Sequence, residues 1–526
     1  MSTKRALKGP SYDSESKSGK SQSVMKTVKG RPPVDPEALT SVGADNYIVY
    51  VDSTSGDVYD VLLNQTNVAQ NNNKYYVIQL LESSLSRQYW CWTRWGRVGY
   101  KGQHSLTACG ADLAEAKRLF ESKFSQKTNN LWEERHDFHK FPGKYDMVLR
   151  DYGKDESSSD EENITSRSIK KPKSDAKTKL RGIKKEQQCK VEPDTSDIPS
   201  KLDVRVQNVI QMICDIRNME EVIVSMNYDV EKAPLGKLTK VQLKAGYDSL
   251  KKIADILGST EKKSQRQISR SRRSVATLSS QDRKKLIEAC NEFYTRIPHC
   301  FGMRPPIVID SREELKNKLE LLETLGEIQI AIEALKSEPT SVGHEHIIDT
   351  HYKNLNCIIR PVEKTDANFD IVRKYLTVNH APTHNTYQME LEEVFETSRS
   401  CEEEIFTNDI GQNVLLWHGS RLTNVYGILS QGLRIAPPEA PVTGYMFGKG
   451  VYFADCASKS ANYCQASQMR NVGFLLLCKV ALGTPLELTQ ANYKADELPI
   501  GYTSVKVVVL HISDNKLTSI FLLGPW

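Results

Sequence analysis

A charged, serine-rich stretch at 149–199 divides the chain and limits how it can fold more than any other feature. Residues 155–162 are acidic, and 167–190 hold ten Lys or Arg against two acidic residues. A stretch with so few apolar side chains cannot build a core, so we predict a charged linker between separately folded domains. Residues 1–31 contain eight Lys or Arg, which predicts a disordered basic arm over 1–42.

The basic runs leave two interpretations open. A single run of this kind is a plain solvated linker about as often as it is a nuclear-import or phosphate-binding segment. Two runs that flank one folded module favour a nucleic-acid partner and a location in the nucleus. A third run, 262–273, interrupts a helical region and predicts an exposed loop.

Composition excludes several classes of protein. With 526 residues, of which 39% are hydrophobic and 26% charged, the chain is long enough for three ordinary globular domains and their linkers. Its longest apolar runs are far shorter than the ~20 residues of a membrane span, and its first residues predict no secretory signal. The eleven cysteines form no CxxC pair, so we predict a reducing compartment and no metal site.

Residues 43–148 predict a small, mostly β module. The segment 74–80 is aromatic and β-branched, and 114–124 has the apolar spacing of a short helix. Trp95 and Arg97 flank a glycine, a pattern suited to stacking on a terminal DNA base and clamping a phosphate. From these residues alone, a core tryptophan beside a surface arginine is the more common outcome.

Residues 200–337 predict an all-α bundle. Val206, Val209 and Ile213 recur at helical spacing, and Ser311 belongs to a capping box that opens a second apolar stripe. No residue pattern in this module assigns chemistry to it.

Residues 345–526 contain the pattern that best fits chemistry. A predicted strand at 415–420 places His418 and Ser420 on one face, with Gly419 between them. No Gly-x-Ser-x-Gly motif accompanies this pair, so a nucleophilic serine is not favoured. A glycine between two polar side chains instead suits a ligand amide that lies against the backbone.

A second group of polar residues follows a long loop rich in Pro and Gly. That loop precedes a predicted strand at 451–454 and a predicted helix at 457–466. On this helix Lys459, Ser460 and Tyr463 would share one side. Opposite the histidine, they would suit a flat aromatic carboxamide, although a buried histidine beside an unrelated Tyr and Ser is the more common arrangement.

Longer motifs in all three modules resemble the zinc-finger-less, DNA-dependent branch of the poly(ADP-ribose) polymerases. The module at 43–148 resembles the WGR domain, which senses DNA breaks in that family, and 200–337 resembles its autoinhibitory helical domain. Residues 345–526 resemble its ADP-ribosyltransferase catalytic domain. The motifs that carry the resemblance are Asn64-Gln65-Thr66-Asn67, Arg94-Trp95-Gly96-Arg97-Val98-Gly99, Pro142-Gly143-Lys144-Tyr145, Pro234-Leu235-Gly236-Lys237-Leu238, His418-Gly419-Ser420-Arg421, Gly448-Lys449-Gly450-Val451-Tyr452-Phe453-Ala454-Asp455 and Ser458-Lys459-Ser460-Ala461-Asn462-Tyr463-Cys464.

The resemblance implies an α+β multidomain fold. It comprises a small mixed-β WGR module, an all-α regulatory module and a mixed α/β catalytic module. It also implies NAD+ as the substrate, no metal, and a DNA-binding role for Trp95 and Arg97.

The catalytic set implied by the resemblance is His418, Tyr452 and Lys459. His418 would bind the adenine-side ribose, and Lys459 would help to position a glutamate. The full set of positions implied to bind NAD+ is His418, Gly419 and Ser460, with Tyr452 and Tyr463 around the nicotinamide, and Ser420, Asn424, Gly427 and Arg434 along the adenosine.

The chain departs from the family pattern near its C-terminal end. The family places its catalytic glutamate in a Tyr-Asn-Glu-Tyr-type strand, but no glutamate follows Glu497. The resemblance fades after about residue 506, so we expect a truncated catalytic domain whose closing strands are missing, although the apolar run 507–510 could pair as a substitute strand. Cys300 stands where the family has an aspartate, so we expect one polar contact toward the cofactor to change.

Two functions follow from the resemblance. The first is a nuclear, DNA-break-activated NAD+ ADP-ribosyltransferase of DNA repair. It would make poly(ADP-ribose) on itself and on chromatin proteins, including histones, with a histone-modification accessory factor as a further partner. The second is a DNA-end-binding protein whose transferase is catalytically impaired because the glutamate is absent. Neither function involves a membrane.

Overall fold

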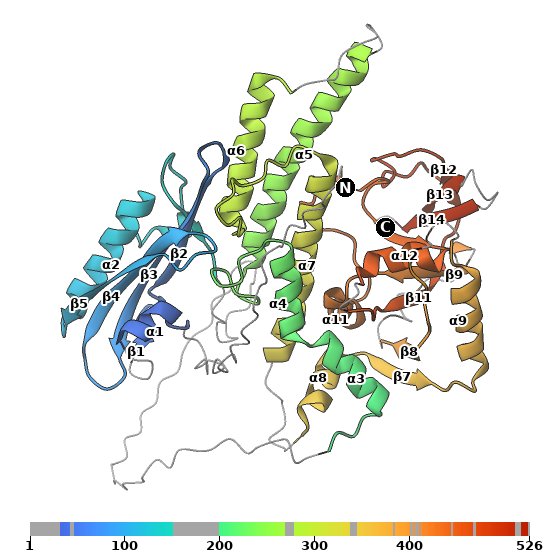
Figure 1. Cartoon of the computed structure of the whole chain (residues 1–526), viewed down its shortest axis with the longest axis horizontal. Helices are drawn as coiled ribbons and strands as arrows, with labels where there is room; N and C mark the ends of the chain where they lie inside the picture. The colour runs from blue at the N-terminus through green and yellow to red at the C-terminus, as the bar shows by residue number, and fades with distance from the viewer. Residues whose placement is uncertain are drawn as a thin grey trace, which may run out of the picture.

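A computed structural model of the chain describes residues 32–42, 47–150, 199–268, 278–336 and 345–523, apart from short gaps at 382–383, 385, 400–401, 403–405, 407–409, 412, 443–444, 467–469 and 511–516. The predicted basic arm at 1–31 and most of the predicted linker at 149–199 lie outside the described residues. In Figure 1 the WGR module lies at one end, the regulatory module in the middle and the catalytic module at the other end. The α+β multidomain fold class is thus confirmed.

The WGR module is a six-stranded sheet in the order β5-β4-β3-β2-β6, with β1 paired to β3. On β3, Tyr76, Ile78 and Leu80 share one face and pack on Phe120 and Phe124 of helix α2, as the period of two in a strand requires. The elements are β1 (Tyr47–Val49), β2 (Asp60–Asn67), β3 (Asn72–Ser83), β4 (Tyr89–Arg97), β5 (Gln103–Gly110), α2 (Leu113–Thr128) and β6 (Asp146–Val148).

The opposite face of this sheet carries a short helix from the N-terminal side of the module. Helix α1 (Pro36–Val42) belongs to a segment, 32–42, that we had predicted to be part of the disordered arm. Val34 and Ala38 pack on Leu81 and Trp92 of the sheet. These apolar side chains, next to the polar arm, give the segment enough buried surface to order it.

The regulatory module is a bundle whose core side chains include Leu250, Phe293 and Leu322, all fully buried. Helix α7 packs on α5 within the bundle and on α11 of the catalytic module. The predicted loop at 262–273 is helical as far as Ile268, because Lys, Gln and Arg are good helix formers. The helices are α3 (Val204–Ile213), α4 (Ile216–Ser225), α5 (Lys240–Ile268), α6 (Ser280–Arg296) and α7 (Arg312–Lys336).

The catalytic module is built on a six-stranded sheet in the order β11-β9-β10-β14-β13-β12, beside a small β7-β8 sheet. Its elements are α8 (Ile347–Leu355), β7 (Ile358–Val362), α9 (Ala367–Val378), β8 (Val394–Ser398), β9 (Asn413–Gly419), α11 (Leu422–Gln431), β10 (Val451–Ala454), α12 (Ala457–Ala461), β11 (Leu475–Ala481), β12 (Pro485–Leu488), β13 (Ser504–Leu510) and β14 (Leu517–Leu523).

The expectation that the closing strands are missing is wrong. Strand β14 pairs with β10 over Val451↔Leu523 to Ala454↔Ile520, and β13 continues the sheet on its other side. Backbone pairing needs only extended, apolar segments, and β13 supplies buried Val505 and Val507. The family's strand motif is therefore not required to close the sheet.

The helix predicted at 457–466 is shorter than expected. Helix α12 ends at Ala461, and a turn of 3-10 helix follows over Asn462–Cys464. Gln465 has a left-handed backbone, φ 54°, which ends the helical turn. The predicted strand at 451–454 is confirmed. In the parts of the chain that the structure describes, every helix is too short or too polar to span a bilayer.

Candidate functional site

The predicted carboxamide site lies where β9 meets α12. A Cβ on Gly419 would lie 1.9 Å from the backbone oxygen of Ser460, so only a glycine allows this approach of strand and helix. Ser460 is 4% exposed and its hydroxyl donates to the Trp417 backbone oxygen at 2.9 Å. The structure therefore brings Gly419 and Ser460 together, as the sequence predicts.

His418 is held in a defined tautomer. Its Nδ1 lies 2.9 Å from the backbone oxygen of Tyr452. A carbonyl oxygen only accepts, so Nδ1 carries the hydrogen. Burial lowers the pKa of His418, partly offset by this hydrogen bond. The ring is thus neutral near pH 7, and Nε2 is a hydrogen-bond acceptor.

The two tyrosines predicted to enclose a ring differ in their surroundings. The Tyr452 hydroxyl donates to the Gly448 backbone oxygen at 2.6 Å, which fixes its ring beside the long loop. Tyr463 is 44% exposed, and the ammonium of Lys316 on α7 lies 5.8 Å from its ring centroid. Lys459 sits on α12, next to Ser460 in the chain.

The residues predicted for the adenosine side gather on α11 and just after it. Asn424 donates to the Ser420 hydroxyl at 3.0 Å. Gly427 on α11 faces α7, and a Cβ there would lie 1.9 Å from Oε2 of Glu327. The Arg434 guanidinium forms an ion pair with the same Glu327.

One face of α7 contacts some of the predicted NAD+ residues and two residues near them in the chain. Glu320 pairs with Arg421 at 3.3 Å, Glu323 accepts a hydrogen bond from the Tyr445 hydroxyl, and Glu327 pairs with Arg434. Together with Lys316 over Tyr463, the contacting positions follow helical spacing, so they lie on one side of the helix. We call Glu320, Glu323 and Glu327 the acidic face of α7.

Burial between the modules shifts the pKa of two residues of this acidic face, Glu323 and Glu327. Desolvation raises the pKa of Glu323 to about 7, with smaller opposing effects from Tyr445 and Lys316. Desolvation also raises the pKa of Glu327, against the lowering effect of Arg434. The ionised forms of Glu323 and Glu327 are therefore disfavoured while α7 is docked.

The acidic face is the part of the site that sequence reasoning missed. The apolar stripe of the same helix was predicted, but its acidic residues resemble an ordinary solvated helix face. The missing signal was their spacing at 320, 323 and 327 together with the arginines at 421 and 434. Complementary charges on two modules predict a contact only when the modules are known to meet.

The predicted DNA-binding pair is split between two environments. The Trp95 ring stacks on Tyr76 with ring centroids 5.7 Å apart and an interplanar angle of 13°. Arg97 instead donates to the backbone oxygens of Asn71 at 2.8 Å, Gly302 at 2.5 Å and Arg304 at 2.7 Å. Arg97 therefore joins the WGR module to the regulatory module.

Lysines and further aromatic rings surround Trp95, and sequence reasoning did not single them out. Lys127 lies 4.6 Å above the Tyr76 ring, and Lys74 lies 5.2 Å above Tyr145. Desolvation and three neighbouring lysines lower the pKa of Lys127. A cluster of like charges on stacked rings fits the phosphates and bases of a nucleic acid.

Two buried asparagines, Asn64 and Asn73, also join the WGR and regulatory modules. Asn64 donates to the backbone oxygens of Tyr294 and Thr295 at 3.1 and 3.0 Å. Asn73 donates to the His299 backbone oxygen at 2.8 Å. Both asparagines are buried, so these contacts are shielded from water.

Cys300 lies at this same interface rather than near the predicted NAD+ residues. A Cβ on Gly99 of the WGR module would be 2.2 Å from its Sγ. The expected change in a contact toward the cofactor is therefore wrong in its location. The reason is that the chain turns back to the WGR sheet directly after His299, whose ring is buried.

Within the described ranges, no group of His, Cys, Asp and Glu has the arrangement of a metal site.

Comparisons with known proteins match all three modules. Residues 59–139 match the WGR domain, 200–352 the poly(ADP-ribose) polymerase regulatory domain, and 366–521 the poly(ADP-ribose) polymerase catalytic domain. The last match runs through β13 and into β14, beyond residue 506, where the motif resemblance fades.

Three relatives named "Poly [ADP-ribose] polymerase 2" illustrate the similarity. The Homo sapiens protein is 48% identical over 479 residues, which cover 91% of this chain and 74% of the relative. The Arabidopsis thaliana protein is 42% identical, covering 86% of this chain and 64% of the relative. The Zea mays protein is 38% identical, covering 98% and 72%. The chain thus spans about two thirds to three quarters of the length of these relatives, and it belongs to the poly(ADP-ribose) polymerase family.

Proposed function

We propose that this chain is an NAD+ ADP-ribosyltransferase that DNA breaks activate by moving α7 away from the catalytic module. The observation that carries the proposal is the acidic face of α7, which holds Arg421, Tyr445 and Arg434 along the predicted NAD+ site. While α7 is docked, its carboxylates occupy the groups that an adenosine diphosphate would need. Undocking frees those cations for the pyrophosphate and ribose.

Residues of the chain itself fit the chemistry of transfer. The neutral His418 offers Nε2 as an acceptor for a ribose hydroxyl, and the Gly419 backbone with Ser460 suits the carboxamide. In the reaction the bond between nicotinamide and ribose breaks, nicotinamide leaves with the electron pair, and an acceptor oxygen bonds to the sugar carbon. The sugar passes through an oxocarbenium-like state, so groups that bind its hydroxyls gain most in the transition state.

DNA ends are the proposed activator. Trp95 and Tyr76 offer a stacking surface, and Lys74 and Lys127 offer charge beside it. Arg97 would connect this surface to the regulatory module, because its guanidinium already binds Gly302 and Arg304. A DNA end that engages Trp95 therefore acts within a few residues of a contact that holds the bundle.

Label transfer from NAD+ tests the proposal. We expect the purified chain to incorporate label with nicked DNA, and His418→Ala to remove most of it. Trp95→Ala should weaken binding to nicked DNA and reduce stimulation without changing label incorporation in the absence of DNA. Incorporation that is equal with and without DNA would contradict activation by breaks.

A second function is a DNA-end-binding protein with an impaired transferase. The observation that favours it is that neither β13 nor β14 contains an acidic residue, and no glutamate follows Glu497. Removing one preorganised charge that stabilises a transition state lowers turnover by about 10²–10³-fold. In the same assay, DNA binding without label incorporation would support this function and exclude the first.

The partners and location follow from the first function. We propose the chain itself and chromatin proteins, histones included, as acceptors of poly(ADP-ribose), with a histone-modification accessory factor as a further partner. We also propose a role in DNA repair in the nucleus. Fractionation of cells that express a tagged chain, before and after DNA damage, tests the location.

A further inference from the structure

The segment at 32–42, which we call the N-terminal segment, is docked on the WGR sheet by buried polar contacts as well as by its apolar side chains. The backbone nitrogen of Asp35 donates to the Gln79 side chain at 2.8 Å, and Gln79 donates back to the Pro33 oxygen at 3.1 Å. Asp35 itself accepts from the Arg94 guanidinium at 2.7 and 2.9 Å. The side chains of Arg94 and Asp35 are only 7% and 4% exposed.

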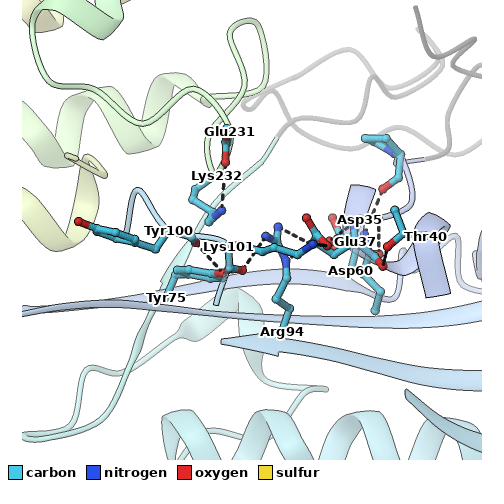
Figure 2. Close-up of polar contacts among 12 residues, drawn as sticks. Asp35, Glu37, Thr40, Asp60, Tyr75, Arg94, Tyr100, Lys101, Glu231 and Lys232 are labelled. Carbon is cyan, nitrogen blue, oxygen red and sulfur yellow. Dashed lines mark hydrogen bonds and ion pairs between the residues drawn. The ribbon is translucent and has the colours of Figure 1, made fainter. Parts of the chain in front are cut away.

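The same arginine lies beside a buried lysine of the regulatory module. Lys232 is 1% exposed, and its ammonium lies 4.4 Å from the ring centroid of Tyr75. The Arg94 guanidinium lies 5.4 Å from the same centroid. Figure 2 shows Lys232 pointing from the regulatory module toward Tyr75 and Arg94, with Asp35 beyond the arginine. Two buried cations therefore share one ring.

The positive charge of the Lys232 ammonium is poorly neutralised by residues of the regulatory module. Among the described residues its ammonium has no hydrogen-bond acceptor, and its ion-pair partner Glu231 lies 3.6 Å away and is 77% exposed. Desolvation and Arg94 lower the pKa of Lys232, while Asp229, Glu231 and Asp35 act in the opposite direction. Of these three carboxylates, only Asp35 comes from outside the regulatory module.

The surrounding contacts tie these groups to both modules. Arg150, just after β6, pairs with Asp60 on β2 at 3.2 Å and donates to the Lys232 backbone oxygen at 2.8 Å. Asp60 in turn accepts from Gln79, the residue that holds Asp35. The N-terminal segment and residues 229–238, which we call the Lys232 loop, are therefore connected through the sheet as well as through the charges of Asp35, Arg94 and Lys232.

We propose that the N-terminal segment is a third component of the interface between the WGR and regulatory modules. In this arrangement Asp35 is a positioning residue: it neutralises Arg94, and this allows Lys232 to stay buried on Tyr75. When the segment leaves the sheet, two uncompensated cations face each other and the Lys232 loop is released. The N-terminal segment thereby has a direct connection to the regulatory module. The meaning of this connection for activation rests on the proposed DNA-stimulated function.

Hydrogen exchange of the full chain, without NAD+ and without DNA, tests the proposal. Asp35→Asn should raise exchange at 229–238 by about tenfold or more, since it removes one partner of a buried pair. Glu37→Gln is the matched control, because it makes the same chemical change two residues later, where the partner Lys101 is largely exposed. The control should leave exchange at 229–238 within about twofold of the unmodified chain.

A double-mutant cycle with Lys232→Met decides whether charge carries the effect. In the Lys232→Met background, Asp35→Asn should raise exchange at 229–238 by no more than about threefold, because the second buried cation is gone. An equal effect of Asp35→Asn in both backgrounds would overturn the proposal.

Truncation separates a local effect from loss of the whole sheet. A chain that begins at residue 32 should keep its protection at 229–238, and a chain that begins at residue 43 should lose it as Asp35→Asn does. Faster exchange throughout β3 in the second chain and in Asp35→Asn would show that the segment only stabilises the WGR sheet, and the proposal would fall. Because this readout needs neither DNA nor NAD+, a failed label-transfer assay would leave its result intact.

Discussion

The regulatory module contacts its two neighbours through different kinds of interaction. Toward the WGR module, buried Asn64 and Asn73 bind backbone oxygens of the bundle. Toward the catalytic module, the polar contacts are carboxylates that meet partly exposed cations, as in the Glu320–Arg421 and Glu327–Arg434 pairs, beside the apolar packing of α11 on the bundle. Hydrogen bonds to buried backbone are strongly directional and insensitive to salt, whereas partly exposed ion pairs are weak and are screened.

The difference assigns a task to each interface. A contact made of backbone hydrogen bonds keeps its geometry, so a displacement at the WGR sheet moves the bundle with it. The ion pairs of the catalytic contact are weak, so we expect them to break before the buried hydrogen bonds of the WGR contact do. Under the proposed function, a signal that starts at the predicted DNA surface would then be released at the acidic face of α7, next to the predicted NAD+ residues. The predictions below test this assignment.

The largest effect is expected from the buried asparagines. The double variant Asn64→Ala, Asn73→Ala leaves backbone oxygens at the interface without hydrogen-bond donors. Each buried oxygen left unpaired destabilises the interface by about 1–3 kcal/mol. We expect the stimulation of label transfer by nicked DNA to fall by about tenfold or more as a result. Asn67→Ala is the control, because its side chain bonds to Gln70 within the WGR module. Unchanged stimulation in the double variant would show that the hydrogen bonds of the WGR interface do not transmit the signal.

Breaking the Glu320–Arg421 pair on the acidic face of α7 should have the next largest effect. Glu320→Gln removes an ion pair worth about 0–1 kcal/mol, so we expect label transfer without DNA to rise by up to about fivefold. Glu313→Gln, on an exposed turn of the same helix, is the control. A Glu320→Gln variant that has the same activity without DNA as the parent chain would contradict the assignment.

A smaller effect is expected from pH, through Glu323. Docking raises the pKa of this carboxyl from 4.5 to about 7, so the docked state holds a proton that the released state gives up. The stabilisation of docking is therefore complete below about pH 4.5 and is lost as the pH rises through 7. Basal label transfer, expressed as a fraction of the DNA-stimulated rate at each pH, should rise between about pH 5 and pH 7 and level off above that. In Glu323→Gln this fraction should be nearly flat, and a wild-type slope there would assign the pH dependence to another group.

The smallest effect is expected from salt. Raising the ionic strength from about 0.05 to 0.5 M screens partly exposed pairs, and we expect basal transfer to increase by about twofold. Hydrogen exchange of β2 and α6, which meet at the WGR interface, should not change over the same range. If salt raised hydrogen exchange of β2 and α6 as well as basal transfer, the two interfaces would not differ in their sensitivity to salt.

Much of the fold could be predicted from periodicity, and much of the candidate site could not. The alternation along β3 and β4 places Tyr76 and Trp95 together, and the apolar stripe of α7 defines its buried side. The acidic face of α7 was missed because its meaning depends on a module more than ninety residues away. The roles assigned to His418 and Ser460 came from motif resemblance and stay predictions, although their geometry fits.

The segment after residue 506 shows what reasoning from motifs fails to predict. Its motif had diverged, so sequence reasoning expected the closing strands to be missing and left only 507–510 as a substitute strand, whereas the structure forms both β13 and β14. Motifs report chemistry, whereas strand pairing depends on extended, apolar backbone. A chain can therefore lose the signature of a site and keep the fold around it.

Strand β14 has a further consequence, for how the catalytic module is made. It is among the last segments of this sequence to be synthesised, yet it lies inside the sheet between β10 and β13. The earlier strands β9, β10 and β11 must therefore wait with one edge unpaired until residues 517–523 emerge from the ribosome. The WGR and regulatory modules have no such dependence and can fold during synthesis. In a growing chain, the surface that we propose for DNA would thus be complete before the catalytic sheet is.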